Sequence, residues 1–117
     1  MNLFAGLSVA LATPFTYKPV AQVPLGACVV VPSSLPRKGI RQIERPKCRT
    51  NAGTLVKLAV TRNLTKHKAS YYFRVTKAKN GAIFIRTYGH HVTLRVTWSY
   101  PAVGVYLPYV RTKKYHL

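Results

Sequence analysis

Carboxylates are almost absent from this sequence. Its 117 residues include 19 Lys and Arg but one acidic residue, Glu44, so the formal net charge is +18 at neutral pH. General acid–base pairs, carboxylate nucleophiles and sites for hard metal ions all depend on carboxylates. We therefore expect no catalytic activity, no cofactor and no metal ion, and we expect Glu44 to pair with Arg41 or Arg45.

Cysteines are also scarce, since the chain contains only Cys28 and Cys48. There is no C-x-x-C pair, and no histidine lies at ligand spacing from either cysteine, which argues against a structural metal site. We expect two buried thiols. A disulfide between them is the alternative in a compartment that oxidises thiols.

Long apolar runs are missing as well. No stretch approaches the roughly 20 apolar residues of a membrane-spanning helix. The first twelve residues are apolar and end in Ala10-Leu11-Ala12, which is similar to a signal-peptidase site. Because the run is short and has no basic residue before it, we expect a buried strand or helical turn there rather than a secretion signal.

What the sequence has in abundance is positive charge combined with strand-forming residues. Such an excess cannot be neutralised by internal ion pairs, and the densest external source of negative charge is a phosphate backbone. Disordered basic tails are poor in aromatic residues, whereas this chain has 8 Tyr, 4 Phe and a Trp. These features predict one folded domain, residues 1–117, that binds RNA or single-stranded DNA.

The charge is distributed unevenly along the chain. Residues 1–53 are apolar and rich in proline, apart from a basic stretch at 37–49 that lies among prolines and therefore predicts an irregular extended loop. Residues 113–117 form a short basic tail. The candidate phosphate-binding residues of the basic stretch are Arg37, Lys38, Arg41, Arg45, Lys47 and Arg49.

The second half of the chain alternates between apolar and polar residues, as strands with one buried face do. In residues 91–100 the apolar set is Val92, Leu94, Val96 and Trp98, which we expect in the core. Asn80-Gly81 predicts a type I′ hairpin turn. The fold class is therefore mostly β, with a single antiparallel sheet or meander over 54–112. The expected strands are 54–62, 71–77, 82–88, 91–100 and an edge strand in 103–112, with short strands at 15–18 and 27–31.

If one sheet collects these strands, their polar sides form one exposed surface. Its lysines and arginines can contact phosphates, its threonines can bond to bases or sugars, and Tyr72 offers a ring for base stacking. Lys66 and Lys68, in the loop that joins two of the strands, would add phosphate contacts. The candidate surface contains Lys57, Thr61, Tyr72, Arg74, Thr76, Arg95 and Thr97.

One segment is similar to a known family. VKLAVTRNLTKHKASYYFRVTKAK, followed by HVTLRVTWSY, resembles the central hairpin and a later strand of the coat proteins of single-stranded RNA bacteriophages. The resemblance covers about residues 55–100, and the helices that follow in that family have no counterpart here. It implies a sheet shared by two chains that binds RNA on its inner face, with an inward set of Lys57, Thr61, Arg74, Thr76, Arg95 and Thr97.

These observations predict a viral coat or genome-packaging protein, found in a virion and associated as a homo-oligomer. The first alternative is a ribosomal or organellar ribosomal protein within an intracellular ribonucleoprotein particle, because such chains also combine a small β domain with basic extensions. The second is a secreted cationic protein that acts on anionic membranes. That alternative needs cleavage after Ala12 and a Cys28–Cys48 disulfide.

Overall fold

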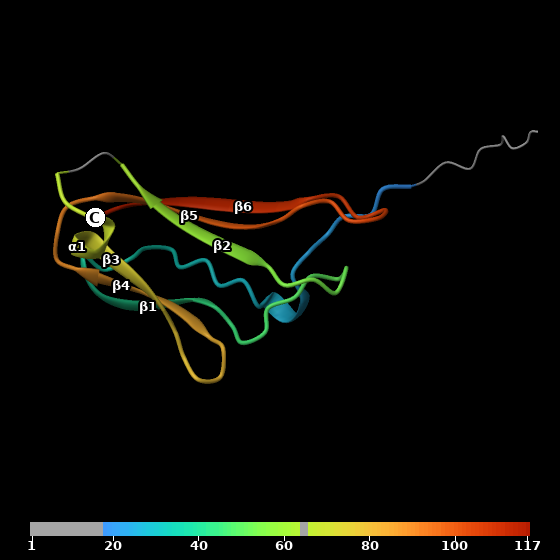
Figure 1. Cartoon of the computed structure of the whole chain (residues 1–117), viewed down its shortest axis with the longest axis horizontal. Helices are drawn as coiled ribbons and strands as arrows, with labels where there is room; N and C mark the ends of the chain where they lie inside the picture. Colours follow the sequence, from blue (N-terminus) through green and yellow to red (C-terminus); the bar gives the residue numbers. More distant parts are fainter. Residues whose placement is uncertain (1–17, 64–65) are drawn as a thin grey trace, which may run out of the picture.

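The computed structural model describes residues 18–63 and 66–117. The predictions for the first twelve residues, and most of the strand expected at 15–18, lie outside this part of the chain. The prediction of a mostly β fold is confirmed, and the described residues form six strands in two antiparallel sheets of order β1-β4-β3 and β2-β5-β6 (Figure 1). The strands are β1 Lys38–Glu44, β2 Lys57–Arg62, β3 Phe73–Lys77, β4 Ile83–Tyr88, β5 Thr93–Tyr100 and β6 Tyr109–His116; the helical turns are η2 Leu25–Ala27 and α1 Ala69–Tyr72.

The expected single sheet is thus two three-stranded sheets. The resemblance implied that residues 54–62 and 71–77 pair as a hairpin, but β2 pairs with β5 and β3 pairs with β4. Alternation along a strand shows which side chains are buried but leaves open which strands are neighbours. Here α1 directly precedes β3, and β2 and β3 belong to different sheets.

The core lies between the two sheets. Leu94, Val96 and Trp98 of β5 are fully buried together with Ile43 of β1 and Ile85 of β4. The indole Nε1 of Trp98 donates a hydrogen bond of 2.9 Å to the carbonyl oxygen of Ile43, so the largest core side chain also has its polar atom satisfied. The predicted core face of residues 91–100 is confirmed.

One edge of this sandwich, between β1 and β6, is closed by the proline-containing segment 29–36, which runs between these strands in Figure 1. The Tyr115 hydroxyl donates to the carbonyl oxygen of Pro32 at 2.8 Å, and the Thr87 hydroxyl donates to that of Pro36 at 2.7 Å. The strand predicted at 27–31 is reduced to an isolated bridge between Val29 and Glu44, and Pro32, which has no N–H to donate to a ladder, follows it directly.

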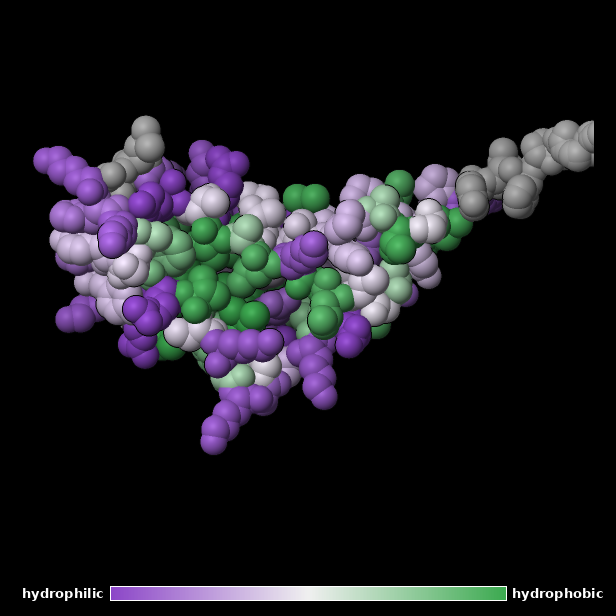
Figure 2. Space-filling view, in the orientation of Figure 1, coloured by the Kyte–Doolittle hydropathy of each residue, from purple (hydrophilic) through white to green (hydrophobic). Residues whose placement is uncertain are grey.

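The opposite edge of the sandwich is more open. Figure 2 shows apolar surface in the middle of the molecule, between the two sheets, with hydrophilic side chains around it. Leu55, just before β2, and Val75 of β3 are 53% and 39% exposed. The two layers therefore bury the strand centres but leave an apolar strip accessible beside β2 and β3.

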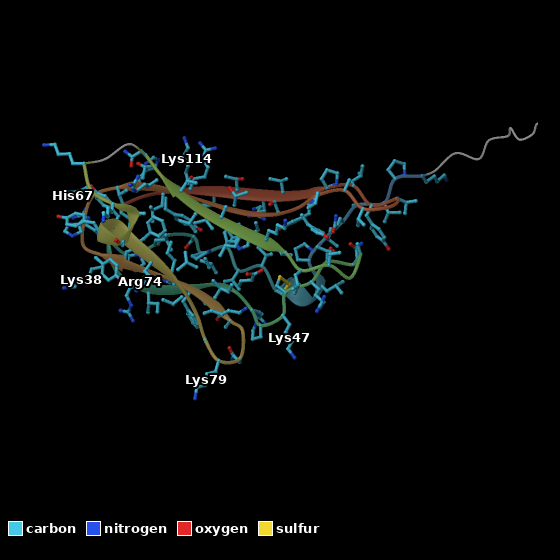
Figure 3. The ribbon with its side chains drawn as sticks, viewed as in Figure 1. Lys38, Lys47, His67, Arg74, Lys79 and Lys114 are labelled. Atoms are coloured by element: carbon cyan, nitrogen blue, oxygen red, sulfur yellow. A yellow bond between two sulfur atoms is a disulfide. The ribbon has the colours of Figure 1, made fainter. Side chains whose placement is uncertain are left out.

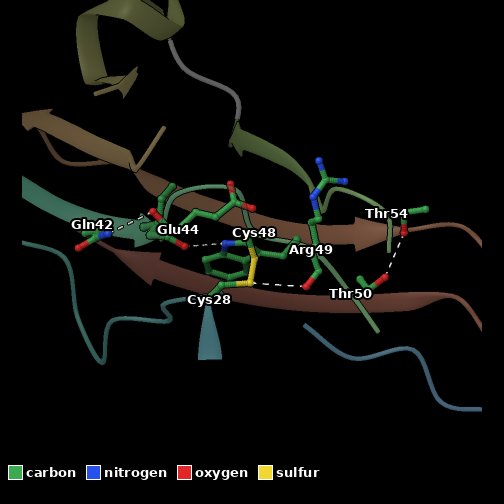
Figure 4. Close-up of a disulfide and its surroundings, with 9 residues drawn as sticks. Cys28, Gln42, Glu44, Cys48, Arg49, Thr50 and Thr54 are labelled. Carbon is green, nitrogen blue, oxygen red and sulfur yellow. Dashed lines mark hydrogen bonds between the residues drawn. A yellow bond between two sulfur atoms is a disulfide. The ribbon is translucent and has the colours of Figure 1, made fainter. Parts of the chain in front are cut away.

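Cys28 and Cys48 form a disulfide, with Cα atoms 5.2 Å apart and both residues buried (Figure 4). The expectation of two free thiols was therefore wrong, and the alternative holds. The bond joins the N-terminal segment to the end of the basic stretch. It closes a chain segment with a sequence separation of 20, which restricts the unfolded chain and so stabilises the fold.

The predicted basic loop at 37–49 is largely a strand, because residues 38–44 form β1 and only its ends are irregular. Pro36 and Pro46 lie just outside β1, where they do not interrupt its hydrogen bonds. The predicted tail at 113–117 is mostly part of β6.

The turn at Asn80-Gly81 is not type I′. Gly81 has a positive φ of 94° whereas Asn80 does not, and the Gly81 N–H bonds to the Ala78 carbonyl, as in a three-residue loop.

We predict that Trp98→Ala lowers the free energy of unfolding by about 3–5 kcal/mol, because it leaves a large cavity between the sheets. Urea denaturation followed by circular dichroism would measure the loss. Trp98→Phe serves as the control, since it retains most of the volume and should cost less. A Trp98→Ala variant as stable as the parent would contradict this description of the core.

Candidate nucleic-acid interface

The predicted binding residues of the sheet divide between two surfaces. Lys57, Thr61, Arg95 and Thr97 belong to the sheet β2-β5-β6, whereas Arg74 and Thr76 belong to β1-β4-β3. Because the two sheets bury their inner faces against each other, their outer faces point in opposite directions. Figure 3 shows Lys114 of β6 on one side of the molecule and Arg74 on the other.

The outer face of β1-β4-β3 combines rings and cations, and we call it the aromatic-basic face. Ile85 and Thr87 of β4 are 1% and 2% exposed and point into the core, so the residues that alternate with them point outward. In the register of the sheet, Phe84 lies opposite Gln42 of β1 and Thr76 of β3. Arg86 lies opposite Ile40 of β1 and Arg74 of β3. Tyr88 lies opposite Lys38 of β1. The face contains Lys38, Ile40, Gln42, Arg74, Thr76, Phe84, Arg86 and Tyr88.

The middle strand gives this face its chemistry. Along β4 the outward residues are Phe84, Arg86 and Tyr88, in the order ring, cation, ring, with successive side chains about 7 Å apart. Both rings are partly exposed and Arg86 is exposed. Unpaired bases stack on aromatic rings displayed by a sheet, while adjacent cations contact the phosphates. Arg74, directly across from Arg86, adds a second cation to the same row.

The sequence reasoning missed Phe84 and Tyr88. The segment 82–88 is apolar on both sides, so its alternation does not distinguish an inner from an outer face. The available signal was Arg86, a cation that a buried face does not accommodate. Because side chains alternate along a strand, Phe84 and Tyr88 lie on the same outer face as Arg86.

The outer face of β2-β5-β6 carries cations and hydroxyls, and we call it the hydroxyl-basic face. Arg95 lies opposite both Thr61 and Lys114, and the hydroxyls of Thr97 and Thr112 are 3.3 Å apart. Such a surface suits contact with phosphates and sugars. The face contains Lys57, Ala59, Thr61, Thr93, Arg95, Thr97, Ser99, Val110, Thr112, Lys114 and His116.

A pocket of about 330 Å³ lies at one end of the hydroxyl-basic face. Arg62 contributes to it, and its Nη2 donates to the carbonyl oxygen of His67 at 2.9 Å. Its Nε is buried and has no hydrogen-bond partner within the described part of the chain. The pocket is lined by Thr61, Arg62, Asn63, Thr93, Arg95 and Lys114.

Tyr72 is not on an exposed face. It is only 6% exposed, because α1 replaces the expected start of the strand and turns this side chain toward the core. Its neighbour Tyr71 is 40% exposed and lies between two imidazoles, with ring centroids 4.0 Å from His67 and 3.8 Å from His90. Its ring is therefore not exposed for the base stacking that the sequence predicted.

The remaining predicted residues lie on the surface. Lys66 and Lys68 are exposed on either side of His67, and Arg37 and Arg41 are exposed at and beside β1. Arg45, Lys47 and Arg49 are exposed in the loop that follows β1.

Glu44 does not form the local pair expected with Arg41 or Arg45. It is 5% exposed, and burial raises the pKa of its carboxyl to about 7, while the positive charge of Lys77 acts in the opposite direction. Among the described residues there is no group of three or more His, Cys, Asp or Glu side chains that could hold a metal ion. The same residues include no helix of the length and apolarity needed to cross a membrane.

Comparison with protein-family models, with curated proteins and with solved structures gives no match to this chain. The resemblance to phage coat proteins therefore stays a prediction.

We predict that Phe84→Leu weakens binding to an oligouridylate of about ten nucleotides by about fivefold or more, the lower end of a lost base–ring stack. Leucine keeps an apolar side chain on the sheet but removes the ring. Fluorescence anisotropy would measure the affinity. Tyr106→Leu, in the turn before β6, removes a ring outside both faces and should leave the affinity unchanged; equal losses in the two variants would contradict a stacking role for Phe84.

Proposed function

We propose that this chain is a structural nucleic-acid-binding protein that binds single-stranded RNA and packages it, as a viral coat or genome-packaging protein does. The observation that supports this best is the row of Phe84, Arg86 and Tyr88 on the middle strand of an exposed sheet. Rings on a sheet favour unpaired bases over duplex DNA, because bases within a duplex are stacked on one another. RNA and single-stranded DNA share this chemistry, and we favour RNA.

The charge distribution supports the same function. Neither outer face contains a carboxylate, since the only acidic residue of the chain, Glu44, is buried. Cations that have no carboxylate nearby are neutralised by phosphates, and the release of condensed counterions from the polynucleotide drives association.

Two basic faces on opposite sides favour packaging over simple binding. One protein with phosphate-binding surfaces on both sides of a thin sandwich can hold two segments of a polynucleotide at once, and so draw them together. The aromatic-basic face would bind unpaired bases, and the hydroxyl-basic face would bind a second backbone through Arg95 and Lys114.

The sheet edges bear on the proposed homo-oligomer. The edge strand β6 carries Arg111, Lys113 and Lys114, and the edge strand β2 carries Lys57 and Arg62. Lysines and arginines on an edge oppose its pairing with another copy of the chain. We therefore propose that copies associate only after nucleic acid has neutralised these charges.

The disulfide bears on both alternatives. Disulfides are rare in reducing compartments, which counts against a ribosomal protein, and they persist in secreted proteins and on virions. The Cys28–Cys48 bond is one of the two features that a secreted cationic protein requires. The other is cleavage after Ala12, which mass spectrometry of the mature protein would decide, because an intact N-terminus removes that alternative.

Matched pairs of substitutions test the bridging of two polynucleotide segments. Arg74→Ala with Arg86→Ala, and Arg95→Ala with Lys114→Ala, each remove two charges from cross-strand neighbours, on opposite faces. Both variants should lose condensation of long single-stranded RNA, measured by light scattering. Only the first should also lose affinity for a short oligonucleotide, by about tenfold, or about 1.4 kcal/mol.

Two results would contradict this function. If either double variant condenses long RNA as well as the parent does, the two faces do not bridge. If both variants lose the same affinity for the short oligonucleotide, the rings of the aromatic-basic face do not define the binding site.

A further inference from the structure

A pocket of about 500 Å³ lies apart from both outer faces, between the loop after β1 and the hairpin that joins β3 to β4. Cationic side chains line it from both sides, and Figure 3 shows two of them, Lys47 and Lys79, on the same side of the molecule. The only acidic residue of the chain lines it too. Its charged lining residues are Arg45, Lys47, Arg49, Lys77, Lys79 and Glu44.

Hydrogen bonds and the disulfide hold the loop that forms one wall. Cys48 is bonded to Cys28, its carbonyl oxygen accepts a hydrogen bond of 3.1 Å from the N–H of Val56, and the N–H of Arg45 donates to the Cys28 carbonyl at 2.8 Å. The other wall touches this loop, because a Cβ atom at Gly81 would lie 3.7 Å from the backbone nitrogen of Lys47. The loop and the hairpin thus lie against each other, and cations from both line one space.

The lining combines two kinds of chemistry. Five cations provide an environment for an anion, and Leu55, Val56 and Ile83 provide an apolar wall that could contact a sugar or base. Leu55 is 53% exposed, which leaves this wall accessible. A volume of this size is within the range of small-molecule sites and accommodates a nucleotide.

Glu44 is the one group that opposes an anion there. Its carboxyl is buried beside the disulfide, at the end of β1 (Figure 4). Ionised, it would repel a phosphate and partly neutralise the cations. Protonated, it would carry no charge and could donate a hydrogen bond to a phosphate oxygen.

We propose that this pocket binds the phosphodiester of one nucleotide of the bound polynucleotide, and that Glu44 must be protonated for the phosphodiester to bind. The inference rests on the proposed function, because it assigns one phosphate of that ligand to a defined site. It makes the binding of that phosphate depend on the protonation of one carboxyl.

The direction of this dependence follows from the groups around the carboxyl. Arg45, Lys47 and Arg49 line the pocket from the loop, and Lys77 and Lys79 line it from the hairpin; no described histidine lines it. Since burial raises the pKa of Glu44 to about 7, most molecules are protonated at pH 6 and most are ionised at pH 8. Binding to the protonated form alone weakens about tenfold across this interval.

The dinucleotide UpU is the appropriate probe, because its single phosphodiester keeps one negative charge across this interval whereas phosphate monoesters titrate near pH 6. Binding would be followed by shifts of the backbone amide signals of Lys47, Val56 and Gly81 in NMR titrations at about pH 6 and about pH 8. Sulfate, which carries no sugar or base, distinguishes a general anion site from a nucleotide site.

For the parent protein, we expect UpU to bind about tenfold more tightly at the lower pH. The Glu44→Gln variant should bind UpU with the same affinity at the two pH values. That affinity should equal the parent's at the lower pH, because glutamine mimics the protonated carboxyl. Lys47→Ala with Lys79→Ala should lose binding at both. This double variant changes exposed residues only and tests the pocket even if Glu44→Gln does not fold.

The outcomes separate this inference from the proposed function. If a longer oligonucleotide binds but UpU does not shift the pocket amides, the pocket assignment is wrong and the proposed function stands. If UpU binds the pocket but the longer oligonucleotide binds no more tightly than UpU, the assignment of polynucleotide binding to the outer faces is wrong instead. A pH dependence that persists in Glu44→Gln would remove the role of the carboxyl, and equal binding of sulfate and UpU would reduce the pocket to a general anion site.

Discussion

Repulsion among positive charges is the constraint on which the rest of this structure depends. The chain has 19 lysines and arginines and one acidic residue, so internal ion pairs cannot offset the charge. The fold distributes the cations over several surfaces and leaves groups of them close together. One group lies on each outer face of the sandwich and another around the pocket beside the β3–β4 hairpin, while the single carboxyl is buried next to the cations of that pocket.

The attractive interactions that oppose this repulsion are concentrated in a small core. Trp98 fills the space between the sheets and bonds to the backbone of β1, and the Cys28–Cys48 disulfide ties the irregular N-terminal segment to the loop after β1. Segment 29–36 closes one edge without forming a strand. A protein built this way gains stability from any polyanion that binds the folded state, because bound phosphates remove the repulsion and binding shifts the folding equilibrium.

The sequence predicted the parts of the fold that depend on alternation within one strand. It did not predict the parts that depend on local departures from alternation or on contacts between distant segments. The burial of Trp98 followed directly from the pattern of residues 91–100. The assignment of Tyr72 to an exposed face failed because a short helical turn interrupts the alternation before β3. Phe84 was missed because its strand is apolar on both sides. The disulfide depends on a fold that brings two distant cysteines together, which spacing alone does not reveal.

If phosphates supply the missing counter-charge, as we claim, the affinity for a polynucleotide must fall as the salt concentration rises. The affinity for an oligouridylate would be measured over a series of salt concentrations and plotted on logarithmic axes. Contacts from Lys38, Arg74 and Arg86 predict a straight line with a slope of about −2 or steeper, since each phosphate contact on a single strand contributes roughly −0.7. A slope near zero would contradict the claim, because it would mean that binding, if present, releases no counterions.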